Sequence, residues 1–130
     1  MKELRKPTDA ELAILRVLWA QGPSTVREVA EAMGRSESYT TVLKLLQIMT
    51  EKRLVQRDER QRTHVYEAAY SQDETQNRLV GDLVDRLFDG SAAKLVLQAI
   101  KAGTVSSDEL DEIRTLLSKH RSKKTPGGRR

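Results

Sequence analysis

Hydrophobic residues recur at helical spacing in three stretches near the start of the chain. Thr8 and Glu11 have the spacing of a capping box, and a mostly apolar helical face follows them as far as Gly22. A second helix of about two turns is predicted to begin at Ser24-Thr25 and to end at Gly34. Two helices therefore precede a longer third one.

The third predicted helix follows the polar turn 35–38 and runs to about Arg53. At about 100° per residue, its apolar residues and Arg53 share one sector. The polar sector opposite holds Glu37, Thr40, Lys44, Gln47 and Glu51, flanked by Thr41 and Ile48. This helix is predicted to bury one side and to offer short polar and basic side chains on the other.

Two short β-prone runs, 54–57 and 64–66, flank the charged segment 58–62 and predict a hairpin, although the usual turn glycine is missing. Three helices and a hairpin within about 70 residues follow the order of a winged helix, a helix-turn-helix with a β-wing. We therefore predict a mainly α protein with a winged-helix DNA-binding domain over 1–70.

From Ser71 the pattern is helical again and predicts three more helices, which end near Phe88, Ala102 and Leu117. Three helices in fewer than 50 residues form a thin core by themselves, so their apolar faces are predicted to meet a second copy of the chain. This C-terminal dimerisation region spans 71–120. The expected contact residues are Leu79, Leu83, Leu87, Leu95 and Ile100.

Charge is distributed unevenly along the chain. Residues 1–70 carry twelve Lys and Arg against ten Asp and Glu, residues 71–118 five against nine, and residues 119–130 six against none. A basic front half and tail suit a polyanion, whereas the acidic middle would be repelled by one. Residues 121–130 contain no apolar residue and are predicted to form a disordered basic tail.

Composition excludes several kinds of chemistry. The chain has no cysteine, which rules out disulfides and thiolate metal sites, and its two histidines, His64 and His120, lie far apart. The acidic residues at 108–112 occupy the first turns of a predicted helix, where their negative charges interact favourably with the helix dipole. No phosphate-binding loop or nucleophile elbow is present. We expect no catalytic residue, metal or cofactor, and, without a signal-peptide core at the start, a cytoplasmic protein.

The third helix offers side chains suited to the major groove of double-stranded DNA. Lysine can reach guanine O6 and N7, glutamine can pair with adenine, and a threonine methyl can touch thymine. The wing and the turn before the helix can add phosphate contacts. The candidate DNA-binding residues are Arg35, Tyr39, Thr40, Thr41, Lys44, Gln47, Arg60 and Arg62.

Each feature also has a simpler interpretation. The polar helix face can be a solvated surface, and Asp58 and Glu59 permit a salt-bridged hairpin instead of a DNA-binding wing. Alternatively, the domain is a winged helix that binds another protein, or a nucleic-acid enzyme. DNA binding through phosphates predicts a strong salt dependence that a protein-interaction module lacks, and an enzyme would need metal-binding carboxylates in a basic cleft.

Several segments together resemble the penicillinase/methicillinase repressor family of BlaI/MecI type, to which the copper-responsive CopY repressors also belong. The matching residues are Thr8, Glu11, Ile14, Leu18 and Trp19; Thr25 to Val29; Tyr39 to Val42 with Leu46, Lys52 and Leu54; Leu87 to Ser91; and Leu95 to Leu97. Coverage runs from about residue 7 to 118, and the order and spacing of these segments are specific.

The resemblance implies a dimeric repressor on a palindromic operator. It also implies release by a membrane-bound sensor peptidase system that triggers cleavage in the C-terminal half. The family's cleaved Asn-Phe pair falls at Gln98-Ala99 here, so these two residues mark the expected cleavage region. CopY-type metal sensing needs a C-terminal cysteine cluster, which this chain lacks.

Overall fold

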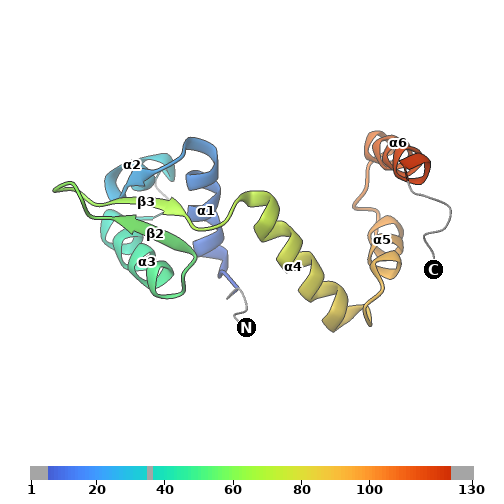
Figure 1. Cartoon of the computed structure of the whole chain (residues 1–130), viewed down its shortest axis with the longest axis horizontal. Helices are drawn as coiled ribbons and strands as arrows, with labels where there is room; N and C mark the ends of the chain where they lie inside the picture. Colours follow the sequence, from blue (N-terminus) through green and yellow to red (C-terminus); the bar gives the residue numbers. More distant parts are fainter. Residues whose placement is uncertain (1–5, 35–36, 124–130) are drawn as a thin grey trace. The chain divides into compact units, whose positions relative to one another are not determined.

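The computed structural model describes residues 6–34 and 37–123. The helices and strands in chain order are α1 (Asp9–Gln21), β1 (Ser24–Thr25), α2 (Val26–Ala32), α3 (Tyr39–Glu51), β2 (Val55–Asp58), β3 (Val65–Ala68), α4 (Gln72–Leu87), α5 (Ala92–Lys101) and α6 (Ser107–Lys123) (Figure 1). Backbone contacts divide the chain into two compact units, Met1–Asp82 and Leu83–Arg130. The predicted fold class, a mainly helical chain with an N-terminal winged helix, is confirmed.

Side-chain caps fix where the first two helices begin. The Thr8 hydroxyl accepts from the Glu11 N–H at 3.2 Å, and the Glu11 carboxylate accepts from the Thr8 N–H at 2.9 Å, so the predicted capping box is present. Thr25 and Glu28 form a second capping box at the start of α2, at 3.1 and 2.9 Å. Each box satisfies two backbone donors that the helix leaves unpaired.

The small sheet has three strands, one more than the predicted hairpin. β2 and β3 pair antiparallel with Asp58 opposite Val65, and β1 pairs with the other edge of β3 with Ser24 opposite Tyr66. A strand of two residues is too short to show an alternating pattern, so the sequence did not reveal β1. Through β1 the start of α2 is joined to the first residues of β3, next to the turn of the wing.

The hydrophobic core is formed by the first three helices and the sheet, which lie together in Figure 1. Its buried members are Ile14, Leu15, Leu18, Val26, Val29, Val42, Leu46, Met49, Leu54, Val55 and Tyr66. They come from α1, α2, α3 and both wing strands, with Leu54 immediately before β2. One side of α3 is therefore fully used for packing, and only the other side is free for a ligand.

Helix α3 begins where the sequence predicted and ends slightly earlier. It starts after Ser38, whose hydroxyl accepts from the Thr41 N–H at 3.2 Å, so Glu37 lies in the polar turn before the helix and not on its polar face. It ends at Glu51, and Arg53 has a φ of 68°, a left-handed conformation that terminates a helix. Arg53 is exposed and does not continue the buried sector. The Leu54 N–H donates to the Met49 carbonyl at 2.9 Å and directs the chain into β2.

The second unit has almost no core of its own. Among its described residues, Val84 is the one buried hydrophobic side chain. Seven large apolar residues are exposed by 39% or more of their surface: Leu83, Leu87, Val96, Leu97, Ile100, Leu116 and Leu117. Folded monomers rarely leave so many large apolar side chains in contact with water.

Helix α6 is longer than predicted. It continues to Lys123, so the prediction of disorder from Arg121 was wrong for residues 121–123. Lysine and arginine are good helix formers, and residues 107–123 contain no Gly or Pro that would stop the helix. The rest of the predicted tail, 124–130, lies outside the described residues.

Candidate nucleic-acid interface

The free side of α3 presents the predicted polar residues. Thr40, Lys44 and Gln47 are all exposed, while Val42, Leu46 and Met49 on the opposite side have no exposed surface. The helix therefore separates its two faces sharply. Lys44 and Gln47, on adjacent turns of one helix, carry hydrogen-bonding groups long enough to reach the base edges of DNA.

The first turn of α3 adds two of the predicted contacts. Tyr39 is the first residue of the helix and is 51% exposed, so its hydroxyl is accessible. Thr41 is also exposed, and its hydroxyl accepts a hydrogen bond from the Ser38 hydroxyl at 3.0 Å. The remaining predicted residue near this end, Arg35, lies outside the described residues.

A buried ion pair fixes α3 against α1. The Lys52 amine, at the C-cap of α3, donates to both carboxylate oxygens of Glu11 at 2.8 and 3.0 Å. The side chains are 22% and 3% exposed respectively. Burial by itself raises the pKa of Glu11, but the hydrogen bonds from Lys52 and Thr8, with the positive charge of Lys52, outweigh it and lower that pKa.

This ion pair was not predicted from the sequence, although the sequence contains a signal for half of it. Glu11 lies three, four and seven residues before Ile14, Leu15 and Leu18, the spacing of one helical face. That placement puts a carboxylate on the buried stripe, and a buried carboxylate requires a cation. The partner could not be identified, because 41 residues separate Lys52 from Glu11.

The wing holds two ion pairs, each between residues two positions apart at the end of β2 and in the turn after it. Arg57 pairs with Glu59, and Arg60 pairs with Asp58. A hydrogen bond to Tyr66 is the main reason that the pKa of Arg57 is raised, with a further contribution from Glu59. Hydrogen bonds from the side chain and backbone of Arg60 lower the pKa of Asp58 to about 2. The salt-bridged hairpin, an alternative raised by the sequence, is therefore present.

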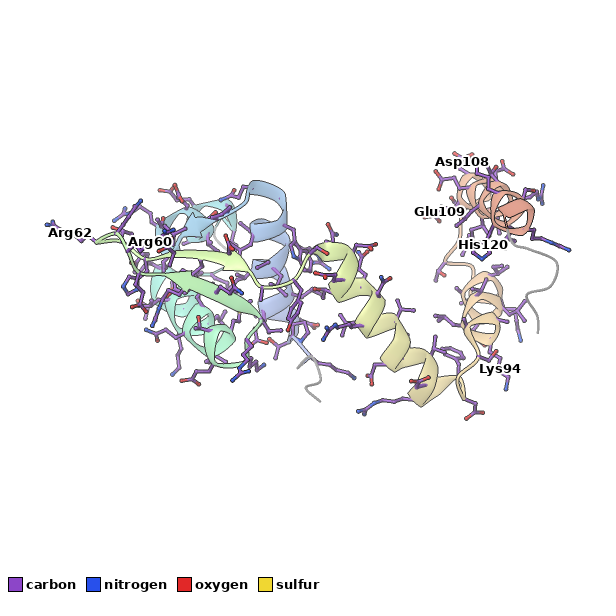
Figure 2. The ribbon with its side chains drawn as sticks, viewed as in Figure 1. Arg60, Arg62, Lys94, Asp108, Glu109 and His120 are labelled. Atoms are coloured by element: carbon purple, nitrogen blue, oxygen red, sulfur yellow. The ribbon has the colours of Figure 1, made fainter. Side chains whose placement is uncertain are left out.

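Figure 2 shows Arg60 and Arg62 on the wing, with Arg62 at its tip. Arg62 is exposed and forms no hydrogen bond or ion pair with the described residues. Arg60 is exposed as well, but its guanidinium is already bound to Asp58. Of the two predicted wing contacts, Arg62 is available as it stands and Arg60 is not.

The first turns of α4 are attached to the winged helix. The indole N–H of Trp19 donates to the Tyr70 carbonyl at 3.0 Å, and the Arg78 guanidinium lies 4.8 Å from the centre of the Tyr70 ring. Lys6 and Asp82 approach to 3.3 Å. These contacts explain why α4 belongs to the first unit as far as Asp82.

The predicted dimerisation residues are distributed over two helices. Leu79, Leu83 and Leu87 lie on α4, and Leu95 and Ile100 lie on α5. Leu83, Leu87 and Ile100 are exposed, whereas Leu79 and Leu95 are half-buried. Three of the five are therefore open to a partner without rearrangement.

The expected cleavage region lies within a helix. Gln98 is exposed and Ala99 is half-buried, both in the last turns of α5. Their carbonyls accept from the N–H groups of Ala102 and Thr104 at 2.9 and 3.3 Å. A peptidase needs an extended chain, so cleavage there would first require this end of α5 to unfold.

Metal-binding clusters and membrane-spanning helices are both absent from the described residues. No group of three or more His, Asp or Glu side chains lies close enough to hold a metal ion within residues 6–34 and 37–123. In the same part of the chain, every helix is too short or too polar to cross a membrane.

Comparison with known proteins gives consistent matches. A family model described as penicillinase repressor matches residues 7–119. The transcriptional regulator BlaI of Mycobacterium tuberculosis is 32% identical over 121 residues, which cover 91% of this chain and 87% of that protein. The penicillinase repressor of Bacillus licheniformis is 21% identical over 95% of this chain and 98% of its own length. Among solved structures, the YusO protein of Bacillus subtilis gives a TM-score of 0.49 at 18% identity, covering 91% of this chain and 77% of that one.

Proposed function

This chain belongs to the penicillinase repressor family and is a DNA-binding transcriptional repressor, and from this premise we propose that it occupies a palindromic operator in the cytoplasm as a homodimer. The observation that supports the DNA contact most directly is α3, whose buried apolar side opposes the exposed Thr40, Lys44 and Gln47. In a two-fold dimer the recognition helices lie about 34 Å apart, one turn of DNA, or a multiple of that distance.

Within each half-site we assign separate roles to helix and wing. Lys44 and Gln47 read base edges, with Thr40 and Thr41 supplying methyl contacts in the same groove. Tyr39 and Arg62 bind the phosphate backbone and set the position of the domain on the duplex. Base contacts select the sequence, and phosphate contacts add affinity for any sequence.

These roles predict different effects for two truncations. Lys44→Ala is expected to lower operator affinity by about ten- to a hundred-fold and to leave binding to unrelated DNA nearly unchanged. Arg62→Ala should weaken both kinds of DNA similarly and reduce the salt slope by about one. Fluorescence anisotropy on operator and scrambled duplexes measures both.

Arg16→Ala is the matched control for this experiment, because it removes another exposed cation, on α1. If Lys44→Ala lost no more operator affinity than Arg16→Ala, α3 would not be the recognition helix. A parallel loss with Thr40→Ala would support the assignment of the whole face.

The exposed apolar residues of the second unit support the homodimer. A helical unit with a single buried hydrophobic residue among those described cannot offset its own conformational entropy. Burying Leu83, Leu87, Ile100 and their neighbours against a second copy supplies the missing core. The acidic middle segment then faces a protein partner and not the phosphates.

We further propose that loss of this dimer releases the operator, through cleavage near Gln98 in α5. A cut there removes α6 and the end of α5 from the shared core. Joining two half-site contacts in one dimer raises affinity by about a hundred-fold or more over either alone, because the second contact becomes intramolecular.

Truncating the chain after Leu97 mimics such a cut. The fragment is expected to sediment as a monomer and to lose most of its operator affinity, with the winged-helix fold retained by circular dichroism. A fragment that dimerised and bound like the full chain would show that cleavage at this position is not the switch.

A further inference from the structure

Asp58 holds Arg60 with unusually complete geometry for a surface ion pair. The Arg60 Nε lies 3.0 and 3.3 Å from the two carboxylate oxygens, and one terminal nitrogen, Nη2, lies 2.8 Å from Oδ2. The backbone N–H of Arg60 also donates to Asp58 at 3.0 Å. One carboxylate therefore both shapes the turn and occupies the guanidinium fork.

A carboxylate and a phosphate bind the same fork of an arginine side chain. Both accept two parallel N–H hydrogen bonds in one plane, so they compete for a single guanidinium. Arg60 is 88% exposed at its side chain, which leaves it within reach of a DNA backbone that the wing approaches. To bind a phosphate, it must first leave Asp58.

We propose that Asp58 acts as an internal phosphate mimic that occupies Arg60 and restrains the affinity of the wing for DNA. This inference rests on the proposed contact between wing and DNA. Arg62, at the tip in Figure 2, carries the phosphate contact of the free wing. The restraint lowers binding to all sequences equally, and so leaves a larger share of operator affinity to the base contacts of α3.

The restraint is constant at neutral pH. The pKa of Asp58 is about 2, so its carboxylate remains charged throughout the physiological range. Charged groups near it are Arg60, Arg57, Glu59 and Glu67, which line the same depression on the wing. Removal of the carboxylate by mutation is therefore the way to release Arg60.

Asp58→Asn is a suitable variant because it separates the two roles of the side chain. The asparagine carbonyl still accepts from the Arg60 N–H and preserves the turn, while the charged partner of the guanidinium is lost. We expect Asp58→Asn in the full-length protein to bind a duplex of unrelated sequence more tightly. One added phosphate contact steepens the log–log salt slope by about 0.9 and contributes at most about eight-fold at 0.1 M salt.

Removing any negative charge raises DNA affinity somewhat, so the control is Glu67→Gln. Glu67 lines the same depression and forms no ion pair with the described residues, so its loss releases no arginine. The decisive comparison is Asp58→Asn in an Arg60→Gln background. There the gain should shrink to the size of the Glu67→Gln effect, because no arginine remains to be released.

Two outcomes would overturn the inference, and they are distinguishable. In the first, Arg62→Gln weakens DNA binding, but Asp58→Asn raises DNA affinity no more than Glu67→Gln does, or raises it by the same factor in the Arg60→Gln background. Asp58 then does not restrain Arg60. If Arg60→Gln, Arg62→Gln and Asp58→Asn all leave the affinity unchanged, the wing does not touch DNA and the proposed wing contact fails as well.

Discussion

Leu83→Asp is expected to convert the protein to a monomer and to lower operator affinity by about 10²- to 10⁴-fold. Leu83 lies on α4 with 42% of its surface exposed, so the monomer itself can tolerate an aspartate there. In the proposed dimer the same position becomes buried, and an unpaired carboxylate is strongly unfavourable in an apolar interface. The large effect follows because each half-site contact must then bind alone.

Gln76→Asp provides the control for charge. It adds the same negative charge to an exposed position of the same helix and should leave both dimer and affinity nearly unchanged. Sedimentation velocity and operator binding are measured on the same samples. A monomeric unmodified protein that still bound its operator tightly would contradict the proposed dimer.

Lys52→Met is expected to lower the free energy of unfolding by about 3 kcal/mol, because it leaves the buried Glu11 carboxylate without its cation. This value is at the lower end for a broken buried pair, since the Lys52 side chain is partly exposed. It is a large fraction of the stability of a small domain. Urea unfolding of the variant measures the loss.

Lys44→Met makes the same chemical change on the exposed side of α3 and should leave the stability within about 0.5 kcal/mol of the wild type. An equal loss in the two variants would show that the effect belongs to the helix and not to the ion pair. A Lys52→Met protein as stable as the wild type would contradict the account of Glu11.

The Glu11 pair also predicts a pH dependence. The folded state lowers the pKa of Glu11, so folding favours the carboxylate, and its stabilising contribution is present above the unfolded value near 4.5. That contribution is lost as pH falls through the lowered folded value. In Lys52→Met the acid-dependent loss should be smaller or reversed, because burial alone raises the pKa.

The elements that the sequence predicted well are those with a strong local signal. Helix α1 was located by its capping box and apolar face, and the exposed side of α3 by the separation of Thr40, Lys44 and Gln47 from the core residues. Both patterns involve residues within a single turn or a single helix. The winged-helix fold was then predicted because three helices and a hairpin follow one another along the chain.

The features that the sequence did not reveal depend on contacts between distant residues or on side-chain geometry. β1 exists only because β3 offers it an edge, and Lys52 finds Glu11 across the fold. The charged residues of the hairpin suggested a salt bridge as an alternative to DNA binding, but the sequence could not show whether Arg60 pairs with Asp58. That pairing depends on side-chain distances near 3 Å.

The most direct test of the central claim, that α3 reads DNA in a two-fold dimer, is to sequence the fragments that the full-length protein retains from a random pool of duplexes. We predict an enriched palindrome whose half-sites lie one helical turn or a multiple apart, and altered base preference in each half-site when the selection is repeated with Lys44→Ala. Retained fragments without a shared sequence, or the same palindrome selected equally well by Lys44→Ala, would contradict the account.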